Sequence, residues 1–174
     1  MNQSKHRLAG IFSTVAMIVG LTLFGTSASW AQQKPLKGQL AGAWTLVSVE
    51  VTAKDGTKRP GFGGPNAKGV LILDASGRYA QMTGRPDRPK FKTTVRRDIP
   101  AAEFGEAARA FGAAFGTWSV NEADKTLILK NELSLIPNND NDERKHSVSL
   151  AKDELKLVVS AAGTTTELVY RRAR

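Results

Sequence analysis

The sequence predicts an all-β protein: an eight-stranded antiparallel up-and-down β-barrel, with one α-helix between the third and fourth strands and a signal peptide before the first. Three observations support this prediction. Strand-like segments recur at short intervals, and turn-forming clusters such as Asp74-Ala75-Ser76-Gly77 join nearly all of them. Eight sequential strands also close well into a barrel, which leaves no exposed sheet edge. A barrel of this size holds either packed side chains or one small ligand.

Alternation of polar and apolar residues is the main strand signal. In one segment, Arg144, His146 and Val148 share a face at a period of two, while Lys145 and Ser147 lie on the other. Charged groups on a face that turns apolar need a partner, water or a ligand, so this strand indicates where a site would lie. The predicted strands are 44–51, 69–73, 78–83, 116–120, 126–133, 144–150, 154–160 and 165–172.

The one predicted helix covers residues 100–115. Pro100 suits a first helical turn, and Glu103 suits the positive end of the helix dipole. We expect the apolar face to pack on the body of the domain rather than on a membrane, because Arg109 is the only basic residue of the polar face. At helical spacing this apolar face holds Phe104, Ala107, Ala108, Phe111 and Phe115.

The segment just before this helix is strongly basic. Between residues 84 and 99 the chain has six Lys or Arg residues and only two acidic ones, Asp87 and Asp98. A solvated extended loop is one interpretation. The other is a charged rim that attracts anionic ligands or makes peripheral contact with an anionic membrane surface.

The N-terminus has the pattern of a secretory signal peptide, which we assign to residues 1–31. Lys5 and Arg7 precede an apolar stretch over 8–24, and small residues lead to a cleavage site after Ala31. An uncleaved membrane anchor is the alternative. Residues 32–39 are then a flexible lead-in and 40–174 the barrel domain. Export would place the protein in the periplasm or outside the cell, which suits a chain with no cysteine.

Several segments together resemble a known family. Leu40-Ala41-Gly42-Ala43-Trp44, Lys68-Gly69-Val70-Leu71, Phe115-Gly116-Thr117-Trp118 and Ser134-Leu135-Ile136-Pro137-Asn138 follow in an order and spacing similar to the bacterial and fungal lipocalin-like domain family. Asn139 departs from the pattern, where an aromatic residue is expected. The resemblance implies the small eight-stranded barrel and a binder of small hydrophobic molecules. It also implies that Arg172 lies over Trp44 in a cation–π contact that closes one end of the barrel.

The candidate ligand-binding residues are Arg144, His146, Trp118, Tyr79 and Tyr170. A few polar groups among aromatic and aliphatic walls are typical of a small-molecule site. Arg144 suits a carboxylate headgroup, which it can pair in a bidentate manner. Two alternatives stay open for Arg144: pairing with a carboxylate such as Glu132, or exposure at the barrel mouth. The alternation leaves open which face Tyr79 occupies.

Other chemistry finds little support in the sequence, so we predict no catalytic residue, metal or cofactor. His146 has no nucleophile partner, because the chain lacks both cysteine and a Gly-x-Ser-x-Gly elbow. One histidine beyond the signal peptide is too few for a transition-metal site. The alternating Asn138, Asp140 and Asp142 fail the calcium-loop pattern, since Glu143 replaces its glycine.

We therefore predict an exported, monomeric barrel that binds or carries a small hydrophobic or amphipathic molecule. A ligand with an anionic headgroup is one form of this prediction. One rival is a barrel enzyme of the isomerase or cyclase type, and another is an envelope interaction protein with a filled barrel. A cavity of several hundred cubic ångströms would favour the binder or the enzyme. Nucleic acid is not an expected partner, because the few aromatic residues do not interleave with the basic run.

Overall fold

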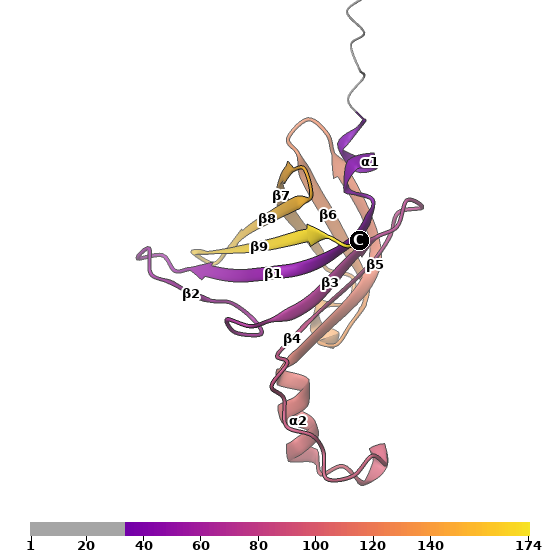
Figure 1. Ribbon diagram of the computed structural model, residues 1–174, viewed down its shortest axis with the longest axis vertical. Helices are drawn as coiled ribbons and strands as arrows, with labels where there is room; N and C mark the ends of the chain where they lie inside the picture. The colour runs from indigo at the N-terminus through magenta and orange to yellow at the C-terminus, as the bar shows by residue number, and fades with distance from the viewer. Residues whose placement is uncertain (1–33) are drawn as a thin grey trace, which may run out of the picture. The chain divides into compact units, whose positions relative to one another are not determined.

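The computed structural model of the protein describes residues 34–174 (Figure 1). The predicted signal peptide lies outside these residues, as do the first two residues of the predicted lead-in. No helix among residues 34–174 is long and apolar enough to cross a membrane. The elements are α1 (Leu36–Leu40), β1 (Gly42–Thr52), β2 (Lys58–Pro60), β3 (Lys68–Leu73), β4 (Arg78–Gly84), α2 (Ala101–Arg109), β5 (Phe111–Asn121), β6 (Thr126–Ser134), β7 (Glu143–Ala151), β8 (Glu154–Ala161) and β9 (Thr164–Arg172), with 3₁₀ turns at Arg96–Asp98 and Pro137–Asn139.

The strands form one closed antiparallel barrel. From β3 to β9 each strand pairs with the next in sequence, and β1 pairs with β3 on one edge and with β9 on the other. The short β2 pairs with the far end of β1, from Glu50 to Thr52, and so continues the position of β3. The nine strands therefore occupy eight positions around the barrel, which confirms the predicted eight-stranded up-and-down architecture.

One end of the barrel is tightly packed. Leucines from three strands point inward there, and each is at most 2% exposed. Each such side chain contributes about 2 kcal/mol by leaving water, so this cluster supplies much of the stability of the fold. The leucines are Leu71 and Leu73 on β3, Leu127 and Leu129 on β6, and Leu155 and Leu157 on β8.

Helix α1 covers this packed end, close to the C-terminus of the chain (Figure 1). Leu40 is fully buried, and its carbonyl oxygen accepts a hydrogen bond of 2.8 Å from Trp44 Nε1. The Glu122 carboxylate accepts bonds of 2.8 and 3.0 Å from the backbone N–H groups of Leu36 and Lys37. The prediction of a flexible lead-in over 32–39 was therefore wrong for residues 36–39. A five-residue helix is too short to show a helical period in the sequence.

The predicted helix over 100–115 is shorter than expected. It ends at Arg109, and residues from Phe111 onward join β5, where Phe111 pairs with Gly84 and Phe115 with Ala80. Ladder hydrogen bonds to β4 therefore outweigh the helical spacing of the phenylalanines. Phe111 and Phe115 leave the predicted apolar helix face as a result.

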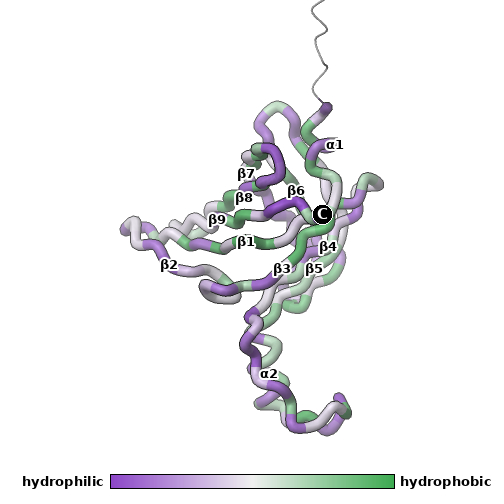
Figure 2. The backbone as a smooth tube through the Cα atoms, viewed as in Figure 1, coloured by the Kyte–Doolittle hydropathy of each residue, from purple (hydrophilic) through white to green (hydrophobic). Residues whose placement is uncertain are grey.

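The expectation that the helix packs on the body of the domain was also wrong. No residue of α2 is buried, and the helix extends beyond the ends of β4 and β5 (Figure 1). Its Phe104 stacks instead on Phe91 of the preceding loop, with ring centroids 6.3 Å apart. Figure 2 shows hydrophilic stretches interrupted by short hydrophobic ones in this part of the chain. We call residues 85–110 the arm.

Candidate functional site

The barrel is hollow in the half that lies away from α1. A cavity of about 470 Å³ is lined by the second half of β1 and the first half of β9, whereas the opposite halves of these strands belong to the packed end. This volume argues against a completely filled barrel. The walls are Val49, Val51, Phe62, Tyr79, Gln81, Thr83, Ala108, Arg109, Phe111, Gly112, Ala113, Ala114, Leu129, Asn131, Ser134, Leu135, Ile136, Asn139, Arg144, His146, Val159, Thr166 and Leu168.

The first half of β5 leaves room for the cavity because its inward positions carry almost no side chain. Gly112, Ala114 and Gly116 alternate along its inner face. At Gly116 the neighbouring strand is so close that a Cβ atom would lie 2.0 Å from the carbonyl oxygen of Lys130. Only glycine fits there. Gly112 and Ala114 line the cavity, so their small size leaves the space beside β5 open.

Tyr79 and Asn131 form a hydrogen-bonded polar pair in the wall of the cavity. Tyr79 and Asn131 flank Gly116 in the cross-strand register, and the Tyr79 hydroxyl donates a hydrogen bond across it to Asn131 Oδ1. Asn131 Nδ2 donates in turn to the Asn139 carbonyl at 2.7 Å. A tyrosine hydroxyl is protonated at neutral pH, and burial raises the pKa of Tyr79 still further from that range. These polar groups have their hydrogen-bond partners within the protein.

His146 differs from them because it lacks such a partner. Its side chain is 5% exposed, and Nδ1 has no hydrogen-bond partner among the described residues. Burial, helped by the charge of Arg144, lowers the pKa of His146 to about 4. The imidazole is therefore neutral at pH 7, with one ring nitrogen able to donate and the other able to accept a hydrogen bond. A buried polar atom without a partner is rare, and the residue that carries it here is also a wall of the cavity.

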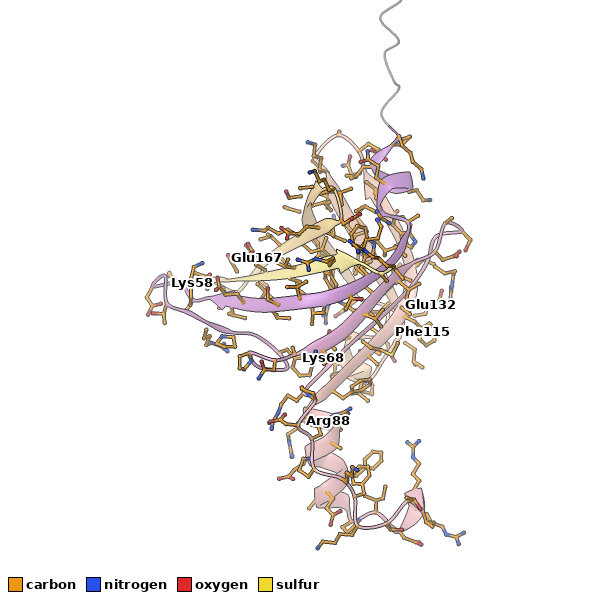
Figure 3. The ribbon with its side chains drawn as sticks, in the orientation of Figure 1. Lys58, Lys68, Arg88, Phe115, Glu132 and Glu167 are labelled. Atoms are coloured by element: carbon orange, nitrogen blue, oxygen red, sulfur yellow. The ribbon has the colours of Figure 1, made fainter. Side chains whose placement is uncertain are left out.

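Arg144 lies on the same inward face, two residues nearer the mouth. Its residue is exposed, and no carboxylate of residues 34–174 lies within ion-pairing distance of its guanidinium. Glu132 pairs with Arg78 on the outer surface instead, through a bond of 2.8 Å between Arg78 Nη2 and Glu132 Oε2 (Figure 3). Pairing of Arg144 with Glu132 is thereby excluded, and an arginine at the barrel mouth remains.

Three of the five predicted ligand residues line the cavity, namely Tyr79, Arg144 and His146. Trp118 does not, because β5 carries it to the packed end, where its Nε1 donates to the Asp74 carbonyl at 2.8 Å. Tyr170 is fully buried behind Gln81, whose Nε2 donates to the tyrosine hydroxyl at 2.8 Å. Burial raises the pKa of Tyr170 to about 12. The predicted pocket wall is corrected for these two residues.

The structure brings Trp44 and Arg172 together at the packed end. The guanidinium carbon of Arg172 lies 4.1 Å from the centroid of the Trp44 ring. Arg172 Nη1 also donates to the Ala41 carbonyl at 3.2 Å, and Nη2 donates to the Gln39 carbonyl. This arginine therefore ties α1, the start of β1 and the end of β9 into one plug.

Several wall residues were missed from the sequence. Asn131 had a signal, because it interrupts the apolar alternation of Leu127 and Leu129 at an inward position. Phe111 was assigned to the helix, and Phe62 lies in a loop where no period applies. Within residues 34–174 no group of three or more His, Cys, Asp or Glu side chains is arranged to hold a metal ion.

A closed eight-stranded barrel with one hollow half belongs to the class of small up-and-down barrels. Residues 41–172 match the model of the lipocalin-like domain family, so the chain belongs to that family. This confirms the resemblance stated from the sequence. No curated protein shows significant similarity to the chain.

Some solved structures are similar to the chain at low identity. The REP1-NXSQ fatty acid transporter is 12% identical, with a TM-score of 0.37, over 79% of this chain and 98% of its own. Fatty-acid-binding protein 1 of Echinococcus granulosus is 11% identical, with a TM-score of 0.38, over 79% of this chain and 99% of its own. A mutant of the fluorescent protein UnaG is 10% identical, with a TM-score of 0.38, over 78% and 96%.

Proposed function

We propose that this protein is an exported binder or carrier of a small amphipathic molecule, whose acidic headgroup pairs with Arg144 while its apolar part fills the barrel. The observation that carries the proposal is an open cavity with two polar wall residues that lack partners among residues 34–174: Arg144 pairs with no carboxylate, and His146 Nδ1 has no hydrogen-bond partner. Apolar walls with a few unsatisfied polar groups are typical of sites for small organic ligands, and about 470 Å³ lies within their usual size.

An acidic headgroup suits the charge distribution inside the barrel. The cavity walls contain Arg109 and Arg144 but no aspartate or glutamate. A carboxylate can accept two parallel hydrogen bonds from a guanidinium, and such charge-assisted bonds are roughly twice as strong as neutral ones. Neutral His146 can donate a further bond from one ring nitrogen to the same headgroup. The apolar part would then contact walls such as Val49 and Leu168.

Export is part of the proposal and rests on the sequence of residues 1–31. Its support is the order of features there: Lys5 and Arg7, an apolar stretch over 8–24 and small residues before Ala31. The protein for the binding experiment is therefore recovered from the periplasm of producing cells. Mass spectrometry of its N-terminus should give Gln32 as the first residue. A chain found only in the cytoplasm would contradict export, and a periplasmic chain that begins at Met1 would contradict cleavage.

The test of the binding proposal is a titration with a fluorescent fatty acid. We expect Arg144→Ala to weaken binding about 10- to 100-fold, since a hydrogen bond to a charged group contributes about 1.5–3 kcal/mol. Lys145→Ala is the matched control. It removes the same charge one residue away, on the outer face of β7. Equal affinity of the parent protein and Arg144→Ala would contradict the proposal that Arg144 binds the headgroup. A fatty alcohol probe should bind both proteins equally.

A further inference from the structure

The arm is held together by few contacts. None of its residues is buried. Besides the stacked pair of Phe91 and Phe104, its main contacts are two cation–π pairs: Arg96 lies 5.3 Å from the Phe104 ring, and Arg88 lies 4.9 Å from the Phe111 ring. Ordering a segment of this length against so little burial is unfavourable in free energy. Contact with a second surface would supply the burial that the barrel does not give the arm.

The exposed face of the arm is basic, with apolar side chains between the charges. Residues 85–97 contain six Lys or Arg and one acidic residue. Asp87 forms an ion pair with Arg85 at 3.1 Å. The other two ion pairs of the arm are longer: Lys92 lies 3.8 Å from Glu103, and Arg97 lies 3.6 Å from Asp98. No carboxylate of the described residues pairs with Arg88, Lys90 or Arg96.

These three basic residues, which lack a carboxylate partner, surround one shallow hollow together with Phe91 and Phe104. Figure 3 places Arg88 at the junction between the barrel and the arm. Val95 and Phe104 stay 46% and 40% exposed, so exposed apolar side chains lie in the same segment as these cations. Cations without a carboxylate partner suit headgroup phosphates, and exposed apolar side chains suit the boundary between headgroups and acyl chains.

We propose that the arm is a docking surface for a bilayer of anionic phospholipid. Its basic side chains contact the headgroup phosphates, and Val95 and Phe104 enter the interface. Ala108, Arg109 and Phe111 at the base of the arm line the cavity, so docking brings the mouth of the barrel to the lipid. The inference goes beyond the proposed ligand site and holds whether or not Arg144 binds a headgroup.

The test is co-sedimentation with vesicles of phosphatidylglycerol and phosphatidylcholine at low salt, against vesicles of phosphatidylcholine alone. The arm variant is Lys90→Asp with Arg97→Asp, because neither side chain holds the arm together. The control is Lys125→Asp with Lys152→Asp, which changes the net charge equally in turns at the packed end. Both control lysines have a positive φ of 53°, a conformation that aspartate tolerates. All proteins share one N-terminus, so any contribution from it is common.

We expect the parent protein and the control to bind anionic vesicles within about threefold of each other and to release at high salt. The arm variant should bind at least about 25-fold more weakly, since each basic residue near an anionic surface contributes about fivefold. Val95→Ser should weaken binding without a change in charge. Equal loss in the arm variant and the control, or equal binding of the parent to uncharged vesicles, would overturn the proposal. So would a dimer, seen without vesicles, that only the arm variant loses.

Discussion

The polar side chains inside the barrel fall into two kinds at the scale of single residues. Tyr79 and Asn131 satisfy each other across Gly116, so they are part of the fold. Within the part of the chain that the structure describes, His146 Nδ1 has no hydrogen-bond partner and Arg144 pairs with no carboxylate, although the two residues lie on the same strand face two residues apart. An unsatisfied buried donor or acceptor costs about 1–3 kcal/mol, and His146 bears this cost in a side chain that also lines the cavity.

His146 gives a prediction for stability against pH. Its pKa is about 4 in the folded protein, below the ordinary value of 6.5, so the unfolded chain binds the proton more readily. Stability should therefore fall as pH decreases from about 6.5 towards 4. By pH 4.5 the loss from this group should reach about 2–3 kcal/mol.

The measurement is the free energy of unfolding in denaturant at pH 7 and pH 4.5, for the parent protein and for His146→Gln. Carboxylates that titrate in this range act equally in both proteins, so the difference between them isolates the histidine. We expect His146→Gln to lose about 2–3 kcal/mol less on acidification. An identical loss in the two proteins would show that His146 is not the buried neutral group described.

The sequence could place Arg144 and His146 because strand alternation is a local property. A period of two fixes which residues share a face, and the flanking Val148 fixes which face is inward. The alternation could not give the position of these residues along the barrel axis. Trp118 and Tyr170 are also inward, yet they lie at the packed end or behind Gln81, since depth along a barrel depends on how all the strands stagger.

At the scale of elements, β5 and the arm explain both the success and the failure of the sequence reasoning. Strands with clean alternation, such as β7, were found within one residue of their ends. The start of β5 was missed because Phe111 and Phe115 also fit a helical period, and only the pairing with β4 decides between the two. The bulge between Leu46 and Ser48 in β1 had no local signal either.

Strand β5 also makes a prediction about the cavity. Ala114→Leu should occupy free volume beside Gln81 without displacing a neighbour, because Ala114 faces the cavity. We expect affinity for the fluorescent fatty acid to fall at least about tenfold, with little loss of stability. The control is Thr117→Leu, an exposed position on the outer face of the same strand. Unchanged affinity in Ala114→Leu would mean that the ligand does not enter beside β5.

At the scale of the whole molecule, residues 34–174 form a barrel whose two ends differ in purpose. The end near α1 holds the fully buried leucines and the plug of Trp44 and Arg172. The other end holds the cavity, the mouth with Arg144 and the arm. Stability is concentrated in one half, which allows the other half to contain a cavity and exposed apolar residues such as Phe62 and Ile136.

This division predicts different effects for two aromatic truncations. Trp44→Ala removes a fully buried ring, its bond to the Leu40 carbonyl and the platform of Arg172. We expect a loss of about 3–5 kcal/mol in the free energy of unfolding, together with the cooperativity of the thermal transition. Phe62→Ala removes a ring that is 47% exposed at the open end, and should change the free energy of unfolding by no more than about 1 kcal/mol.

Both values come from thermal and denaturant unfolding followed by circular dichroism, with fatty-acid affinity measured on the same samples. Phe62→Ala should weaken the ligand more than the fold, because Phe62 is a wall of the cavity. If Trp44→Ala melted like the parent protein, the packed end would not be the stabilising half. If Phe62→Ala lost as much stability as Trp44→Ala, the end with the cavity would contribute as much to stability as the packed end. The division of the barrel into a stabilising half and a binding half would then be wrong.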